Sequence, residues 1–111
     1  MSTYNNQTIH AEISIVPVGT SNTSISKEVA AAFDAIRKTK GIRTSKLTAM
    51  GTQLEVNSMK PILDAIEAAH EAVKSTGAKR IISSIKIAER LDASRSLDDE
   101  IDSVIKKLPK E

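Results

Sequence analysis

The chain has 111 residues, of which 40% are hydrophobic and 27% charged, and its formal net charge is +2. These values are typical of one globular domain, and so small a net charge gives no reason to expect nucleic acid or a membrane surface as partner. The absence of cysteine excludes disulfides, thiolate metal sites and cysteine nucleophiles. No apolar run approaches the roughly 20 residues of a membrane span, and the first residues do not resemble a signal peptide. We therefore expect a cytoplasmic protein with a flexible tail over residues 1–8 and one domain over residues 9–111.

The first strand is predicted over residues 9–16, because apolar and polar residues alternate there. Pro17 and Gly19 interrupt this alternation, and hydroxyl-bearing residues crowd the segment that follows. A helix with one apolar face comes next, and Ser24 or Ser26 is its expected N-cap.

A hairpin is predicted in residues 42–56, where strand-forming residues flank a short break. A second amphipathic helix follows and ends at Gly77, and a fourth strand is predicted over residues 79–88. A short C-terminal helix begins at Ser96, where Asp99 completes a capping box. The order β-α-β-β-α-β predicts an α+β fold: a ferredoxin-like sandwich of a four-stranded antiparallel sheet, with two helices on one face and a short C-terminal helix.

Such a sandwich leaves the second face of the sheet uncovered, and in this chain that face is polar. We interpret it as a ligand platform, a subunit interface, or both. The residues expected on it are His10, Glu12, Ser14, Gln53, Glu55, Ser84 and Lys86.

The segment from Pro17 to Ser26 has the chemistry of a cradle for an anion or a polar ligand, because hydroxyls surround the free N–H groups of a helix start. The alternative is that these serines and threonines only cap the helix, as they do in most helices. The P-loop motif GxxxxGK[ST] is absent.

Glu12 and Glu55 are expected on neighbouring central strands, both on the open face. Two carboxylates there could hold an amine, a cationic ring or an aminopyrimidine, and less readily serve in acid–base catalysis. They could instead form ion pairs with Lys86, Arg80 or a neighbouring subunit.

Two further features are assigned ordinary structural roles. His10 and His70 lack metal-ligand spacing, so we expect no metal, and no motif calls for a cofactor. Gly51, at the break in the hairpin, is expected to supply unusual backbone angles.

Three segments together resemble the thiamine-binding protein family: AEISIVPVGTSNTSISKEVA (Ala11–Ala30), LTAMGTQLEV (Leu47–Val56) and KRIISSIKIAERLD (Lys79–Asp92). The resemblance implies a small cytosolic ferredoxin-like domain that dimerises, often into a homotetramer, by joining sheets. It also implies binding of thiamine, its phosphates or its hydroxymethyl-pyrimidine moiety, with no enzymatic activity.

Carried over by position, the ligand-binding residues that this resemblance implies are Glu12, Ser14, Pro17, Gly19, Thr20, Ser24, Gly51, Thr52, Glu55, Ser84, Lys86 and Arg90. The two carboxylates would recognise the aminopyrimidine or the positive ring, and a phosphate would lie at the helix start. The chain departs from the family pattern after Glu55, where Val56 and Asn57 replace the usual glycine, and at Leu91.

Other functions fit the sequence less well. A structural or regulatory oligomerisation module without a small-molecule ligand is the main alternative. Acylphosphatase activity is disfavoured because the chain lacks the arginine-bearing phosphate loop of those enzymes. RNA binding is disfavoured because the predicted sheet carries no aromatic residues, since the chain has only Tyr4 and Phe33.

Overall fold

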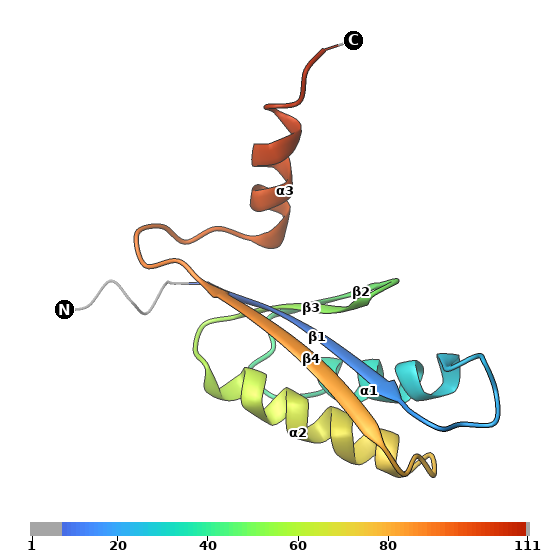
Figure 1. Ribbon diagram of the computed structural model, residues 1–111. Helices are drawn as coiled ribbons and strands as arrows, with labels where there is room; N and C mark the ends of the chain where they lie inside the picture. Colours follow the sequence, from blue (N-terminus) through green and yellow to red (C-terminus); the bar gives the residue numbers. More distant parts are fainter. Residues whose placement is uncertain (1–7, 111) are drawn as a thin grey trace.

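The computed structural model describes residues 8–110. Figure 1 shows a sheet with two helices packed on one face and a third helix projecting away. The elements are β1 (Ile9–Pro17), α1 (Ser26–Arg37), β2 (Thr44–Thr48), β3 (Gly51–Val56), α2 (Lys60–Lys74), β4 (Ile81–Glu89) and α3 (Leu97–Ile105). The strands lie in the order β2-β3-β1-β4 and pair antiparallel throughout. The predicted α+β ferredoxin-like sandwich is confirmed.

The core lies between the sheet and the helices α1 and α2. Because side chains alternate along a strand, the odd-numbered residues of β1 face the helices and are buried, while His10, Glu12 and Ser14 face the open side. The core side chains of β3, Leu54 and Val56, are fully buried. The predicted tail over residues 1–8 lies outside the described residues except for Thr8, whose hydroxyl is bonded to Ser94 and Arg43.

The start of α1 differs from the prediction. The helix begins at Ser26, its N-cap is Ile25, and no side chain caps it. The predicted N-cap role of Ser24 or Ser26 is therefore wrong. The two hydroxyls bond locally instead: their oxygens lie 3.1 Å apart, and Ser24 Oγ accepts a long bond of 3.5 Å from the backbone N–H of Ser26. The N-cap residue Ile25 provides no side-chain acceptor for the first turn.

The hairpin turn also differs in one respect. Gly51 is not among the glycines with positive φ, which are Gly19, Gly41 and Gly77, so its predicted unusual backbone angles are wrong. A close approach explains the glycine better: a Cβ at position 51 would lie 3.0 Å from the carbonyl oxygen of Ile13.

The helix α3 begins with the predicted capping box of Ser96 and Asp99. Glu55 reinforces this start, because its Oε2 accepts a hydrogen bond of 2.5 Å from the backbone N–H of Leu97. Lys46 on β2 forms an ion pair with Asp98. Within residues 8–110, no helix has the length and apolar character that a membrane crossing needs.

Candidate functional site

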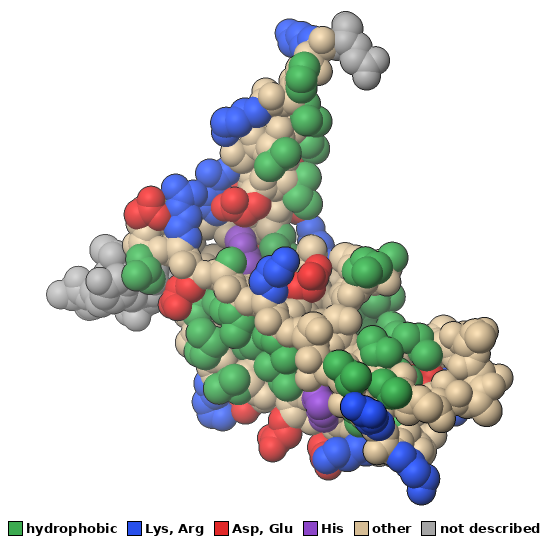
Figure 2. All heavy atoms as spheres, in the orientation of Figure 1, with side chains coloured by type: hydrophobic (Ala, Val, Ile, Leu, Met, Phe, Trp, Pro, Cys, Tyr) green, Lys and Arg blue, Asp and Glu red, His purple; other side chains and the backbone are tan. Residues whose placement is uncertain are grey.

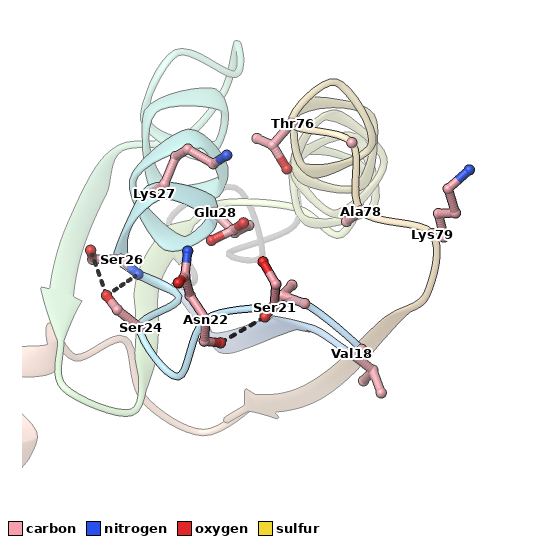
Figure 3. Close-up of a pocket in the computed structure, with 13 residues that line it drawn as sticks. Val18, Ser21, Asn22, Ser24, Ser26, Lys27, Glu28, Thr76, Ala78 and Lys79 are labelled. Atoms are coloured by element: carbon pink, nitrogen blue, oxygen red, sulfur yellow. Dashed lines mark hydrogen bonds between the residues drawn. The ribbon is translucent and has the colours of Figure 1, made fainter.

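A cavity of about 460 Å³, called here the loop cavity, opens where the β1–α1 loop meets the α2–β4 loop (Figure 3). Residues of segments 18–28 and 76–79 line it. Its volume lies within the range of about 300–1,000 Å³ typical of small-molecule sites.

The walls of the loop cavity are rich in hydrogen-bonding groups. Gly19, Thr20 and Ser24, three residues of the predicted site, contribute to them, together with Thr76. The Thr20 hydroxyl donates to the backbone carbonyl of Asn22 at 2.9 Å, which holds the loop in its turn. The uncapped start of α1 also opens here, so the cavity offers both donors and acceptors to a ligand.

Glu28 is the unusual residue of this cavity. It is only 8% exposed, and it makes no hydrogen bond or ion pair with any residue in the range 8–110. In Figure 3 its carboxyl group lies toward the middle of the space, near Ser21 and Asn22, whereas the amine of Lys79 points away. No fully buried side-chain oxygen or nitrogen within residues 8–110 lacks a partner, so the carboxyl oxygens of Glu28 are open to the cavity. A ligand bearing N–H donors or positive charge could bond to them there.

Sequence reasoning assigned Glu28 no role in the site. An acid in the first turn of a helix is usually explained by the helix dipole. One signal could have found it: Glu28 precedes Ala32 and Ile36 by four and eight residues, and all three are buried on one face of α1. An acid on the apolar stripe of a helix is a candidate for function.

The other predicted residues do not gather around the loop cavity. Ser14, Gly51 and Thr52 line a separate, mainly apolar cavity of about 250 Å³ between α1 and the hairpin. Glu12 and Lys86 line a shallow depression on the open face.

Of the remaining residues, Pro17 is buried at the end of β1, opposite Ile81. Ser84 is exposed on the open face, opposite Ser14. Arg90 pairs with Asp92 at 2.7 Å, and this hydrogen-bonded partner raises the pKa of Arg90 above its ordinary value.

The two predicted carboxylates of the open face have separate surroundings. Glu12 accepts a bond of 3.3 Å from the Gln53 side chain. Glu55 is buried beneath the start of α3, bonded to the Leu97 N–H and 4.0 Å from His10. His10 in turn donates from Nε2 to the carbonyl of Arg95 at 2.7 Å. These partners are not the lysine or arginine that the sequence offered as alternatives, and they give Glu55 a part in holding α3.

Residues 8–110 contain no group of three or more side chains placed to hold a metal ion. The loop cavity offers hydroxyls, backbone N–H groups, the amide of Asn22 and the acid Glu28, and Lys27 and Lys79 also line it.

The family model described as thiamine-binding protein matches residues 11–105. This chain belongs to the thiamine-binding protein family. Among its relatives, a UPF0045 protein of Methanothermobacter thermautotrophicus is 41% identical over 100 residues, which cover 90% of this chain and 99% of that protein.

Two solved structures share the fold of this family member. A hypothetical protein of Methanocaldococcus jannascii is 32% identical, with a TM-score of 0.78 over 90% of this chain and 98% of the other. A Thermotoga maritima protein, provisionally named for thiamine biosynthesis or salvage, has a TM-score of 0.70 over 87% of this chain and 98% of its own. At 14% identity, that second likeness shows the fold alone.

Proposed function

We propose that the chain binds thiamine or a related hydroxymethyl-pyrimidine in the loop cavity, without catalysing a reaction. The observation that carries this proposal is Glu28, a largely buried residue that has no partner within residues 8–110 and whose carboxyl oxygens open into the polar loop cavity. Membership of the thiamine-binding protein family supports the choice of ligand.

The ligand chemistry complements the cavity. Thiamine carries an aminopyrimidine and a positively charged ring, so it offers N–H donors and charge to the Glu28 carboxyl group. The hydroxyls of Thr20, Ser24 and Thr76 would orient its polar edges. Among residues 8–110, no aromatic side chain lines the cavity to stack on either ring, so we expect modest affinity, suited to a carrier or sensor.

The other residues that the family resemblance implies remain proposals. Ser14, Gly51 and Thr52 lie on the opposite side of the α1 start, where an apolar cavity could accept a second part of a ligand. Glu12, Ser84 and Lys86 remain available on the open face, and Arg90 lies beyond it.

We also propose that the protein is a homo-oligomer that joins sheets at β4 and works in the cytoplasm. β4 is an edge strand of nine residues, and Ile82, Ile85 and Ile87 on it are substantially exposed. Long exposed edges with apolar side chains are normally paired or covered. An oligomerisation module without a ligand remains the alternative, and it predicts an assembly that responds to no small molecule.

Calorimetric titration with thiamine, the free hydroxymethyl-pyrimidine and thiamine diphosphate tests the ligand. We expect thiamine and the free pyrimidine to bind through Glu28, and the diphosphate to bind as well, because Lys27 also lines the cavity at the helix start that a phosphate would occupy. Folded protein that gives no binding heat with any of the three would contradict the proposal.

A further inference from the structure

The loop cavity is lined by charges of both signs, and none of them comes from the β1–α1 loop. Residues 18–26 carry no charged side chain, and Figure 2 shows this loop, at the right, as a mainly uncharged polar projection. The charged residues of the lining are Lys27 and Glu28 on α1 and Lys79 just before β4. Two bases and one acid give the cavity a positive formal charge.

Lys27 and Glu28 do not neutralise each other. Neither side chain forms a hydrogen bond or ion pair with any residue in the range 8–110. Consecutive residues of a helix point about 100° apart, so the two charges face different parts of the cavity. In Figure 3 the Lys27 amine extends from α1 toward the side of α2, whereas the Glu28 carboxyl group lies nearer Ser21 and Asn22.

The start of α1 adds to the positive character beside Lys27. The first N–H groups of a helix have no acceptor within it, and they favour an anion together with the helix dipole. Within residues 8–110 the one side-chain bond to them is the long bond from the Ser26 N–H to Ser24 Oγ. Glu28, on the same turn and 8% exposed, opens its carboxyl oxygens into the same space, which indicates that the cavity receives a ligand.

Thiamine itself satisfies only one of these two charges. It is a cation, and the formal charge of the cavity is already positive. A phosphate monoester adds about −1.5 to −2 charges near neutral pH, so thiamine monophosphate carries a positive ring and a negative arm. Because Glu28 would repel a phosphate placed against it, the complementary orientation puts the ring at Glu28 and the phosphate at the α1 start.

We infer that the loop cavity selects a phosphorylated ligand that carries both charges. A cationic ring or N–H donor bonds to Glu28, and a phosphate monoester lies at the α1 start, paired with Lys27. The inference rests on the proposed function and makes Lys27 the residue that determines specificity for the phosphorylated form. Within the thiamine series, the preferred ligand is then thiamine monophosphate.

Calorimetric titration of the full chain with thiamine and with thiamine monophosphate tests this selectivity, and the ratio of the two affinities is the readout. We expect the monophosphate to bind about tenfold more tightly, the low end for a charge-assisted bond, because Lys27 is exposed. Lys27→Met keeps the aliphatic stem, and the ratio is expected to fall to about threefold or less, the part that the helix start supplies. Equal affinities in the wild type, or a ratio that Lys27→Met leaves unchanged, overturn the inference.

Two further variants test whether the two charges act on different parts of the ligand. Lys40→Met makes the same change at an exposed lysine beyond the other end of α1, outside the cavity lining, and is expected to keep the wild-type ratio. Glu28→Gln is expected to weaken both ligands while the monophosphate keeps its advantage. An advantage lost in either variant contradicts the assignment of the phosphate to Lys27.

Inorganic phosphate separates this inference from the proposed function. We expect it to shift the amide NMR signals of the first turn of α1, and to shift them less in Lys27→Met. Binding of thiamine with no gain from phosphorylation overturns the inference alone. Phosphate-induced shifts in a protein that binds neither thiamine nor its monophosphate overturn the proposed function and support the anion site at Lys27. Absence of binding by all three overturns both.

Discussion

The two buried acids of this protein, Glu28 and Glu55, lie in two regions that differ in how the start of a helix is satisfied. At the α3 end, Ser96 and Asp99 form a capping box, and Glu55 adds a bond to Leu97. At the α1 end no side chain caps the helix, and Glu28 has no partner within residues 8–110. One helix start therefore has a full side-chain cap, whereas at the other only a long bond from the Ser26 N–H to Ser24 Oγ is present.

Burial of an acid does not by itself mark a ligand site in this protein. Glu55 is slightly less exposed than Glu28, at 6% against 8%, yet its hydrogen bond explains its burial. Glu28 forms no such bond within residues 8–110, and its carboxyl oxygens open into the loop cavity, where a ligand can reach them. Glu28 and Glu55 differ in their hydrogen-bond partners, so replacing each acid in turn tests whether this difference separates their roles.

The largest effect is expected for Glu28→Gln. A hydrogen bond to a charged group contributes about 1.5–3 kcal/mol, so thiamine affinity should fall about 10- to 100-fold in calorimetric titration. Thermal or denaturant unfolding of the free protein should show nearly unchanged stability, because the Glu28 carboxyl oxygens form no bond within residues 8–110 and are open to the cavity. The control is Glu67→Gln, the same change at an exposed position of α2. Equal thiamine affinity in the two variants would contradict a ligand-binding role for Glu28.

Glu55→Ala is expected to act on α3 and not on the ligand. Loss of the carboxyl group leaves the Leu97 N–H without its acceptor, a local cost of about 1–3 kcal/mol. Amide hydrogen exchange at the first turn of α3 should accelerate about tenfold or more, and thiamine affinity should stay within about twofold. A large loss of affinity with unchanged exchange would return Glu55 to the ligand-binding role that the family resemblance implies.

Ser24→Ala tests whether the hydroxyls at the start of α1 contact the ligand. A neutral hydrogen bond contributes about 0.5–1.5 kcal/mol, so removal of this hydroxyl should weaken thiamine binding by about two- to tenfold. Ser58→Ala is the control at an exposed serine far from the cavity lining. If the two serine variants bind alike, the hydroxyls of the loop do not contact the ligand.

The smallest expected effect is the pH dependence of stability that arises from Asp99. Bonds from the backbone and side chain of Ser96 lower the pKa of Asp99 below 3.8. A lowered pKa in the folded state means that its contribution to stability is present above pH 3.8 and is lost as pH falls through the lowered value. NMR titration of the Asp99 carboxyl group should show this. A midpoint at or above 3.8 would contradict a formed capping box.

The fold could be predicted because its signals are local and repetitive. Alternation in residues 9–16, the turn between two strand-forming runs, and the Ser96–Asp99 box each identify an element without knowledge of its neighbours. The prediction of the α1 N-cap was wrong because several serines compete within a few residues. Only the packing of the loop determines which hydroxyl bonds to which group.

The site was harder to predict, because residues on one motif need not share one cavity. The motif after β1 reaches the loop cavity through Thr20 and Ser24, while Ser14 of the same motif lies in another cavity. Thr76 comes from a loop that no motif indicated. Glu28 carried a periodic signal along α1, but an acid near a helix start has an ordinary explanation that conceals it.

A crystal structure of the protein with thiamine bound tests the central claim most directly. We expect density in the loop cavity, with the amino group or the charged ring of thiamine within about 3.5 Å of a Glu28 carboxyl oxygen. Thiamine bound over the open sheet face beside Glu12 and Ser14, with Glu28 still without a partner, would contradict it.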